Sequence, residues 1–138
     1  MDKKNNRKRP LGITILAIIN IIGFVSYIFL YNDPFPLFGS FYLGMPAKFL
    51  YGVSSLLCLL IGIGFLKLKI LTWKLFIGYN IFTISNIIIN HFTISAEELL
   101  LFLGRMPSRT LSVFFELLFL SFLFITVVYV FKRRSFFG

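Results

Sequence analysis

A single acidic residue inside an apolar run is the side chain of this sequence best suited to chemistry. Glu116 is the only charged residue of the run 110–131, and at 1.5 Å per residue it lies about 9 Å from the end of a helix that begins there. A charge at the bilayer centre costs on the order of 2–3 kcal/mol, so we expect this carboxyl to be protonated, paired or extended toward the surface. A carboxyl that takes and releases protons would suit a proton-coupled transporter. The simpler interpretation, which we favour, is a neutral acid hydrogen-bonded to a Ser, Asn or Tyr of a neighbouring helix.

Polar and small residues mark two further helical faces. One polar stripe has spacings of four, three and four, which predict a shared face, and it comprises Tyr79, Thr83, Asn86 and Asn90. This stripe could line a polar cavity with Glu116, but such residues more often join helices, at roughly 0.6 kcal/mol per contact. A second face has small residues four apart, which let another helix approach within the bundle or in a dimer: Ser54, Cys58 and Gly62.

The remaining reactive residue types are too few to build a catalytic or metal centre. The chain has one cysteine, Cys58, and one histidine, His91, which excludes an internal disulfide, a thiolate cage and a histidine metal site. Intramembrane hydrolysis or group transfer normally needs paired acids, a Ser–His pair or a metal cluster. We therefore expect no enzymatic activity, no cofactor and no bound metal.

The composition places these residues in a membrane. Of 138 residues, 58% are hydrophobic and 14% are charged, against about a quarter charged in an ordinary soluble domain, and the mean hydropathy is +0.90. A soluble protein of this size cannot bury so much apolar surface, which excludes a soluble enzyme, a nucleic-acid-binding domain and a disordered tail. The net charge of +9 is concentrated in short runs beside apolar segments, as expected for membrane orientation and contact with anionic lipid.

Four apolar runs are long enough to cross the bilayer. About 20 residues span the hydrocarbon core, and an isolated apolar run crosses lipid only as a helix. The first run exceeds the usual core of a signal peptide, so we expect it to be retained. The sequence therefore predicts an all-α integral membrane protein, a four-helix transmembrane bundle that forms one domain over 1–138, with spans at about 11–30, 49–66, 70–89 and 110–131.

The basic residues predict how the bundle is oriented. The N-terminal tail, the link between the second and third spans with Lys74 just beyond it, and the C-terminal tail together hold 11 of the 14 Lys and Arg residues. The positive-inside rule then places both termini in the cytoplasm, in the cell (inner) membrane. We expect Lys74, just inside the third span, to extend its ammonium to the cytoplasmic surface.

The two outer loops have different patterns. Residues 31–46 mix prolines and glycines with aromatic residues, which predicts irregular backbone. In the second loop, Ser95 followed by Glu98 forms a capping-box pattern, and Gly104 suits a helix end. We expect a short interfacial helix there, over about 96–103.

Three segments resemble a family of small four-span membrane proteins from bacteria and archaea. Residues 9–18, RPLGITILAI, resemble the R-P-x-G-V-T-I-x-A-I opening of these proteins. Residues 64–75 are similar to their basic, Trp-containing inner turn, and residues 129–138 to their basic-aromatic ending. The resemblance implies a four-span membrane fold, and it implies no activity because these proteins are uncharacterised.

Two functional hypotheses follow. The first is a non-enzymatic packing, accessory or interaction protein that binds a second copy or another membrane protein, with anionic lipid at its basic tails and no nucleic acid. The alternative is a proton-coupled small-molecule transporter in which Glu116 is the coupling carboxyl.

Overall fold

The part of the chain described by the computed structural model forms a bundle of long helices. It comprises residues 9–95, 97–98, 101 and 109–137, with the backbone alone at 109–112. Four of the described α-helices are long and apolar enough to span a membrane, as the sequence predicts. The elements in chain order are α1 (Leu11–Phe29), β1 (Phe35–Leu37), β2 (Ser40–Tyr42), α2 (Met45–Leu66), α3 (Ile70–Thr93), α5 (Arg109–Lys132) and the 3₁₀ turn η1 (Arg134–Phe136).

Two helix boundaries lie outside the predicted apolar runs. Helix α2 begins at Met45, four residues before the predicted span, because Pro46 fits the first helical turn, where its missing N–H would be unpaired in any case. Helix α3 continues to Thr93, beyond the predicted end at 89. A helix does not need apolar side chains once it leaves the hydrocarbon region, so hydropathy alone places this end too early.

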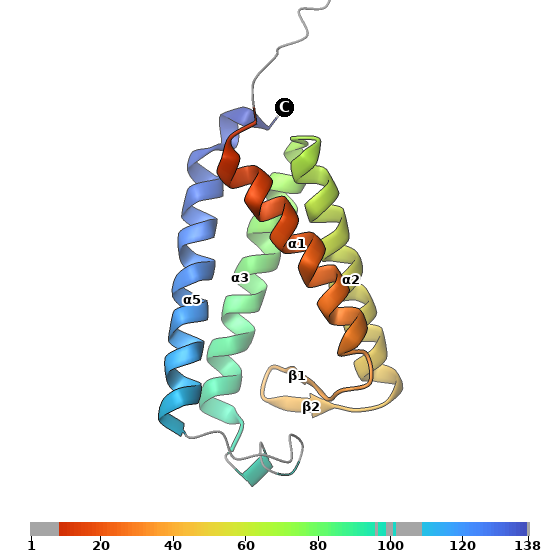
Figure 1. Ribbon diagram of the computed structural model, residues 1–138. Coiled ribbons are helices and arrows are strands. Elements are labelled where there is room, and N and C mark those ends of the chain that lie inside the picture. The colour runs from red at the N-terminus through yellow and green to blue at the C-terminus, as the bar shows by residue number, and fades with distance from the viewer. Residues whose placement is uncertain (1–8, 96, 99–100, 102–108, 138) are drawn as a thin grey trace, which may run out of the picture.

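The helices converge at one end of the bundle and separate at the other (Figure 1). Helix α1 begins and η1 ends at the same end, beside the turn that joins α2 to α3. We call this the closed end. At the opposite end, which we call the open end, α1 and α2 lie apart from α5, and the β1–β2 hairpin occupies the space beside them (Figure 1).

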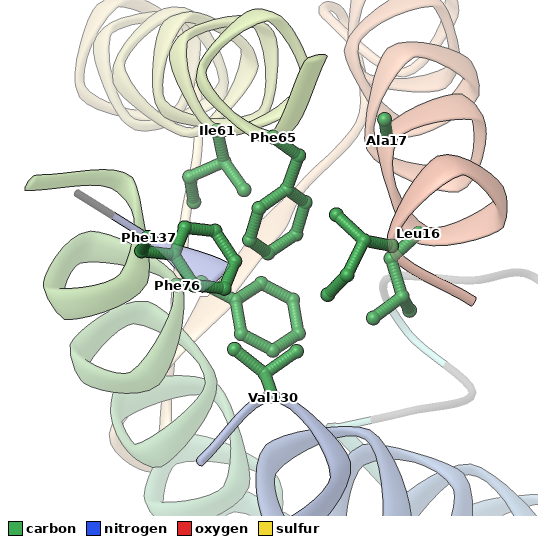
Figure 2. Close-up of a cluster of buried hydrophobic side chains, with 8 residues drawn as sticks. Leu16, Ala17, Ile61, Phe65, Phe76, Val130 and Phe137 are labelled. Atoms are coloured by element: carbon green, nitrogen blue, oxygen red, sulfur yellow. The ribbon is translucent and has the colours of Figure 1, made fainter. Parts of the chain in front are cut away.

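A hydrophobic cluster fills the closed end, with contributions from all four long helices (Figure 2). The ring of Phe65 from α2 packs on Phe76 of α3, with centroids 5.0 Å apart, and on Phe137 after η1, with centroids 5.8 Å apart. Burying aromatic rings at such distances favours packing beyond their area alone. The complete cluster is Ile13, Leu16, Ala17, Ile61, Phe65, Phe76, Val130 and Phe137.

Polar contacts tie the same end together. The guanidinium of Arg9 donates to the carbonyl oxygen of Leu66, at the end of α2. The indole Nε1–H of Trp73 donates to the carbonyl oxygen of Val130 at 3.1 Å, which links α3 to α5. The Leu66 carbonyl lies at the C-terminus of α2, where backbone acceptors lack intrahelical partners. The Val130 carbonyl, near the end of α5, also accepts the backbone N–H of Arg133 at 3.1 Å. The closed end is therefore fixed by side-chain donors as well as by apolar packing.

The loop between α1 and α2 is regular over residues 35–42, where the sequence predicts irregular backbone, so that prediction is wrong for these residues. Strands β1 and β2 pair antiparallel, with Phe35 opposite Tyr42 and Leu37 opposite Ser40. The two turn residues between them, Phe38 and Gly39, have φ values of 46° and 83°. Positive φ at both positions is what a two-residue type I′ hairpin turn requires. Glycine adopts this conformation readily, whereas phenylalanine needs contacts that hold it there.

The segment that follows α3 contains the capping box that the sequence predicts. The backbone N–H of Ser95 donates to Glu98 Oε2 at 3.0 Å, and the backbone N–H of Glu98 donates to Ser95 Oγ at 3.2 Å. Residues 97, 98 and 101 are helical. The other residues of the expected interfacial helix (96, 99–100 and 102–103) lie outside the described residues, as do Gly104 and the basic residues of the tail before Arg9.

Candidate functional site

Two asparagines of the polar stripe hold the hairpin at the open end. Asn86 Oδ1 accepts the backbone N–H of Phe38 at 2.8 Å, and its Nδ2 donates to the carbonyl oxygen of Pro36 at 3.1 Å. Asn90 Oδ1 accepts the backbone N–H of Gly39 at 2.6 Å. The ring of Phe38 also packs edge-on against Phe82, with centroids 5.4 Å apart. These contacts hold the turn at positive φ, so both amides bind protein backbone.

The other two members of the stripe lie deeper in the bundle. The hydroxyls of Tyr79 on α3 and Tyr27 on α1 are hydrogen-bonded at 2.9 Å. The thiol of Cys58 on α2 lies 3.9 Å from the same Tyr79 oxygen, so three helices meet at this point. Thr83 Oγ1 donates to the carbonyl oxygen of Tyr79, within its own helix, at 2.9 Å. The stripe therefore faces α1 and the hairpin, and the hydrogen bonds of Tyr79, Asn86 and Asn90 join these elements to α3.

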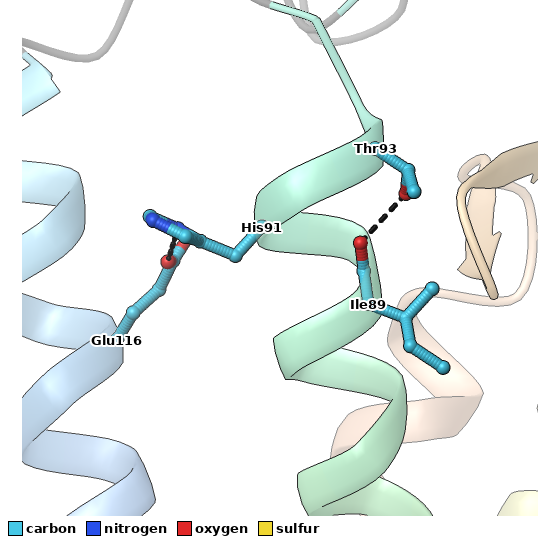
Figure 3. Close-up of polar contacts among 4 residues, drawn as sticks. All are labelled: Ile89, His91, Thr93 and Glu116. Carbon is cyan, nitrogen blue, oxygen red and sulfur yellow. Dashed lines mark hydrogen bonds and ion pairs between the residues drawn. The ribbon is translucent and has the colours of Figure 1, made fainter.

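Glu116 is paired with a residue outside that stripe. His91 Nδ1 lies 2.6 Å from Glu116 Oε2, between the last turn of α3 and α5 (Figure 3). The sequence predicts Ser, Asn or Tyr as the partner, and the predicted third span ends at residue 89, before His91. The additional helical turn of α3 brings His91 opposite Glu116 instead. The structure thus separates Glu116 from Tyr79, Thr83, Asn86 and Asn90.

An imidazole and a carboxyl at hydrogen-bonding distance can exchange a proton. Which partner donates depends on the tautomer and charge of His91. The two side chains are 40% and 39% exposed, so the pair lies at the bundle surface, in the half toward the open end. In the described part of the chain, no group of three or more His, Cys, Asp or Glu side chains is placed to hold a metal ion. The chemistry available to the pair itself is proton transfer.

The small-residue face of α2 is divided between two neighbours. A Cβ placed on Gly62 would lie 2.8 Å from Ile21 Cγ1 and 3.2 Å from the Ala17 carbonyl oxygen, so α1 approaches α2 closely at this glycine. Cys58 is buried on the same side, opposite Gly23 of α1. Ser54 lines a groove on the α3 side of α2. Two of the three predicted residues therefore pack helices within one chain.

Two cavities on the described part of the bundle lie away from the His91–Glu116 pair. One, of about 340 Å³, lies between α1 and α2 near the open end and is lined by Tyr27, Tyr51 and Ser55 among others. The other, of about 430 Å³, lies between α2, α3 and β1. The polar pair and the cavities are thus separate features of the molecule.

The sequence patterns anticipated Glu116 but missed the importance of two residues. His91 stands 25 residues before Glu116, and no local spacing joins them. Tyr27 belongs to no polar stripe that the sequence indicates, and its partner Tyr79 lies 52 residues away. His91 directly follows Asn90, the last residue of the polar stripe. Because that stripe extends the helical pattern past residue 89, it could have indicated that His91 is helical.

No protein-family model, curated protein or solved structure matches this chain. The resemblance of its opening, inner turn and ending to small four-span prokaryotic proteins therefore stays a prediction.

Proposed function

We propose that the protein is a non-enzymatic, multi-pass protein of the cell membrane that acts by binding a second copy or another membrane protein. The observation that carries the proposal is that its polar side chains form hydrogen bonds inside the chain. The described hydrogen bonds of Tyr79, Asn86 and Asn90 join helices and the hairpin inside the chain. What remains on the outside is mainly apolar helix surface, which in a membrane contacts lipid or other helices.

Helix α5 offers the largest such surface for a partner. It packs mainly against α3 (Figure 1), and side chains such as Phe115, Phe124 and Ile125 are more than half exposed. The small residues Gly62 and Cys58 are already covered by α1, so a partner would meet bulky side chains. Aromatic side chains are the type enriched at the centres of protein interfaces.

Photo-crosslinking in native membranes tests this proposal. A benzophenone amino acid replaces Phe124, which is 65% exposed on α5, and in a control replaces the fully buried Phe65. We expect a discrete protein adduct of the Phe124 variant, at the mass of a dimer or of one partner. Lipid adducts alone at Phe124 and at the neighbouring exposed Phe115 and Phe131 would contradict the proposal.

The proposal includes cytoplasmic termini. It is supported by the excess of Lys and Arg in the tails and in the link between α2 and α3. In a Cys58→Ser background, we expect Asn32→Cys, near the hairpin, to react with an impermeant maleimide in intact cells. Lys69→Cys, in the α2–α3 link, should react only after the membrane is opened. The reverse labelling pattern would show that both termini face the outside of the cell, which contradicts this part of the proposal.

The 2.6 Å contact of His91 with Glu116 favours a second candidate, a proton-coupled transporter. In this case Glu116→Gln abolishes proton-driven efflux of lipophilic cations from vesicles, and His91→Ala alters its pH dependence. The infrared band of the Glu116 carboxyl, assigned by difference from Glu116→Gln, should change over the pH range in which transport operates. Efflux that is equal in wild type and Glu116→Gln would end this candidate.

A further inference from the structure

The cavity between α2, α3 and β1 is a groove with mostly apolar walls and one charged end. Leu50, Val53 and Leu57 of α2 form one wall, and Leu75, Gly78 and Phe82 of α3 form the other. Its volume of about 430 Å³ falls within the range of small-molecule sites, roughly 300–1,000 Å³. The groove lies on the outer surface of the bundle, so in a bilayer it opens to the lipid.

The two ends of the groove differ in chemistry. Lys74, one turn into α3 from the closed end, is its single charged lining residue. Among the described residues the Lys74 ammonium forms no salt bridge. The other end is closed by Phe35 and Leu37 of the hairpin, which Asn86 and Asn90 hold in place. A ligand that fits this site is a slender apolar chain with an anionic group at one end.

We propose that this groove binds one acyl chain of an anionic phospholipid, with the phosphate at the Lys74 ammonium and the chain end against the hairpin. The proposal rests on the membrane insertion that the proposed function assumes. It adds to that function a specific lipid ligand at a defined site.

The dimensions agree with a lipid of one leaflet. From Lys74 to Phe82 is eight residues of α3, which is about 12 Å at 1.5 Å per residue. Half of the hydrocarbon core is about 15 Å thick. With the basic link between α2 and α3 at the cytoplasmic surface, Lys74 would lie at the depth of the phosphates of that leaflet, where anionic lipids attract basic residues.

Gly78 gives a direct way to fill the groove. A Cβ added at Gly78 meets no atom within 4 Å, although the residue lies in the groove wall. Leucine can therefore occupy the groove without disturbing packing inside the chain. Gly52 is a matched control, because its Cβ would also meet nothing within 4 Å and it lines the other cavity. Lys67 is a matched charge control, since it lies in the same region but outside the groove lining.

The test is native mass spectrometry of the full chain in detergent, titrated with equal amounts of phosphatidylglycerol and phosphatidylcholine that carry identical acyl chains. For the wild type we expect the first bound lipid to be phosphatidylglycerol, with a preference of about fivefold from one ammonium. Lys74→Gln should remove the preference and keep the binding. Gly78→Leu should remove the first binding event for both lipids.

The controls separate the groove from general charge attraction. Lys67→Gln and Gly52→Leu should behave like wild type, and circular dichroism should show unchanged helix content in each variant. Val53→Phe, which fills the groove from α2, replaces Gly78→Leu if the latter does not fold. An equal loss of preference in Lys67→Gln and Lys74→Gln would overturn the proposal. Unchanged lipid binding in the groove-filling variant would also overturn the proposal. If that variant changes from dimer to monomer while lipid binding stays intact, the occupant of the groove is a second copy of the chain, and the proposal is overturned as well.

The lipid-binding test is independent of the crosslinking test for a protein partner. The crosslinking positions lie on α5, whereas the groove lies between α2 and α3. A failure of lipid binding would leave a crosslinked partner in place, and the absence of a partner would leave the lipid measurements unaffected.

Discussion

A methyl group at Gly62 would test whether α1 and α2 approach each other as closely as the structure describes. The added Cβ would lie 2.8 Å from Ile21 Cγ1 and 3.2 Å from the Ala17 carbonyl oxygen, where well-packed carbon atoms are about 3.5–4.0 Å apart. The Ile21 side chain can rotate away. The carbonyl of Ala17 belongs to the backbone of α1, so relief of that contact requires the whole helix to move back.

Two opposing effects set the size of the change. Overpacking a tight contact costs about 1–3 kcal/mol, while alanine in place of glycine within a helix returns about 0.5–1 kcal/mol. We therefore expect Gly62→Ala to lower the free energy of unfolding by about 1–2 kcal/mol. Gly52→Ala has only the favourable effect, because nothing lies within 4 Å of its Cβ. It should raise the free energy of unfolding by up to about 1 kcal/mol.

The assay is reversible unfolding of the purified protein in mixed micelles, with increasing mole fraction of sodium dodecyl sulfate and helix content followed by circular dichroism. The difference between the two alanine variants is the decisive quantity, since both change the same residue type in the same helix. If Gly62→Ala and Gly52→Ala unfold at the same mole fraction, the close approach of α1 to α2 at Gly62 is refuted.

Three further changes test other contacts. Asn90→Leu removes the acceptor of the Gly39 amide, so exchange of that amide with deuterium should accelerate about fivefold; an unchanged rate would mean that the hairpin is held otherwise. Phe137→Ala empties part of the buried cluster and should lower the unfolding free energy by as much as about 3–5 kcal/mol. Unchanged unfolding in detergent would show that Phe137 lies free of the bundle. Ser95→Ala removes the acceptor of the Glu98 amide and should cost about 0.5–2 kcal/mol of local helix stability. The expected result is faster deuterium exchange of the Glu98 amide at an unaltered global unfolding midpoint. Equal exchange in the variant and the wild type would count against the capping box.

The spans could be predicted because lipid leaves so few alternatives. A long run without charge must form a helix in the hydrocarbon region, whatever its neighbours are. Hydropathy reports the thickness of that region and not the ends of the helices. Hydropathy therefore did not predict that α3 extends past its apolar run, which brings His91 to within 2.6 Å of Glu116.

The partners of the polar residues depend on tertiary structure that no local pattern contains. Glu116 was identifiable as the one acid of its run, but its partner follows from how α3 and α5 are turned toward each other. The hairpin escaped prediction for a related reason. Phe38 replaces the Asn or Asp that usually marks a two-residue turn before glycine, and its conformation is stabilised by Asn86 and Phe82, more than 40 residues away.

The position of Phe137 in the closed end has a consequence for biosynthesis. Chains are made from the N-terminus, so α1, α2 and α3 are synthesised before the residues that complete the cluster around Phe65. Until Val130 and Phe137 have been synthesised, the rings of Phe65 and Phe76 lack part of their covering. The interior of this bundle is therefore complete only after α5 and the turn that follows it have been made, although Phe65 and Phe76 belong to earlier helices.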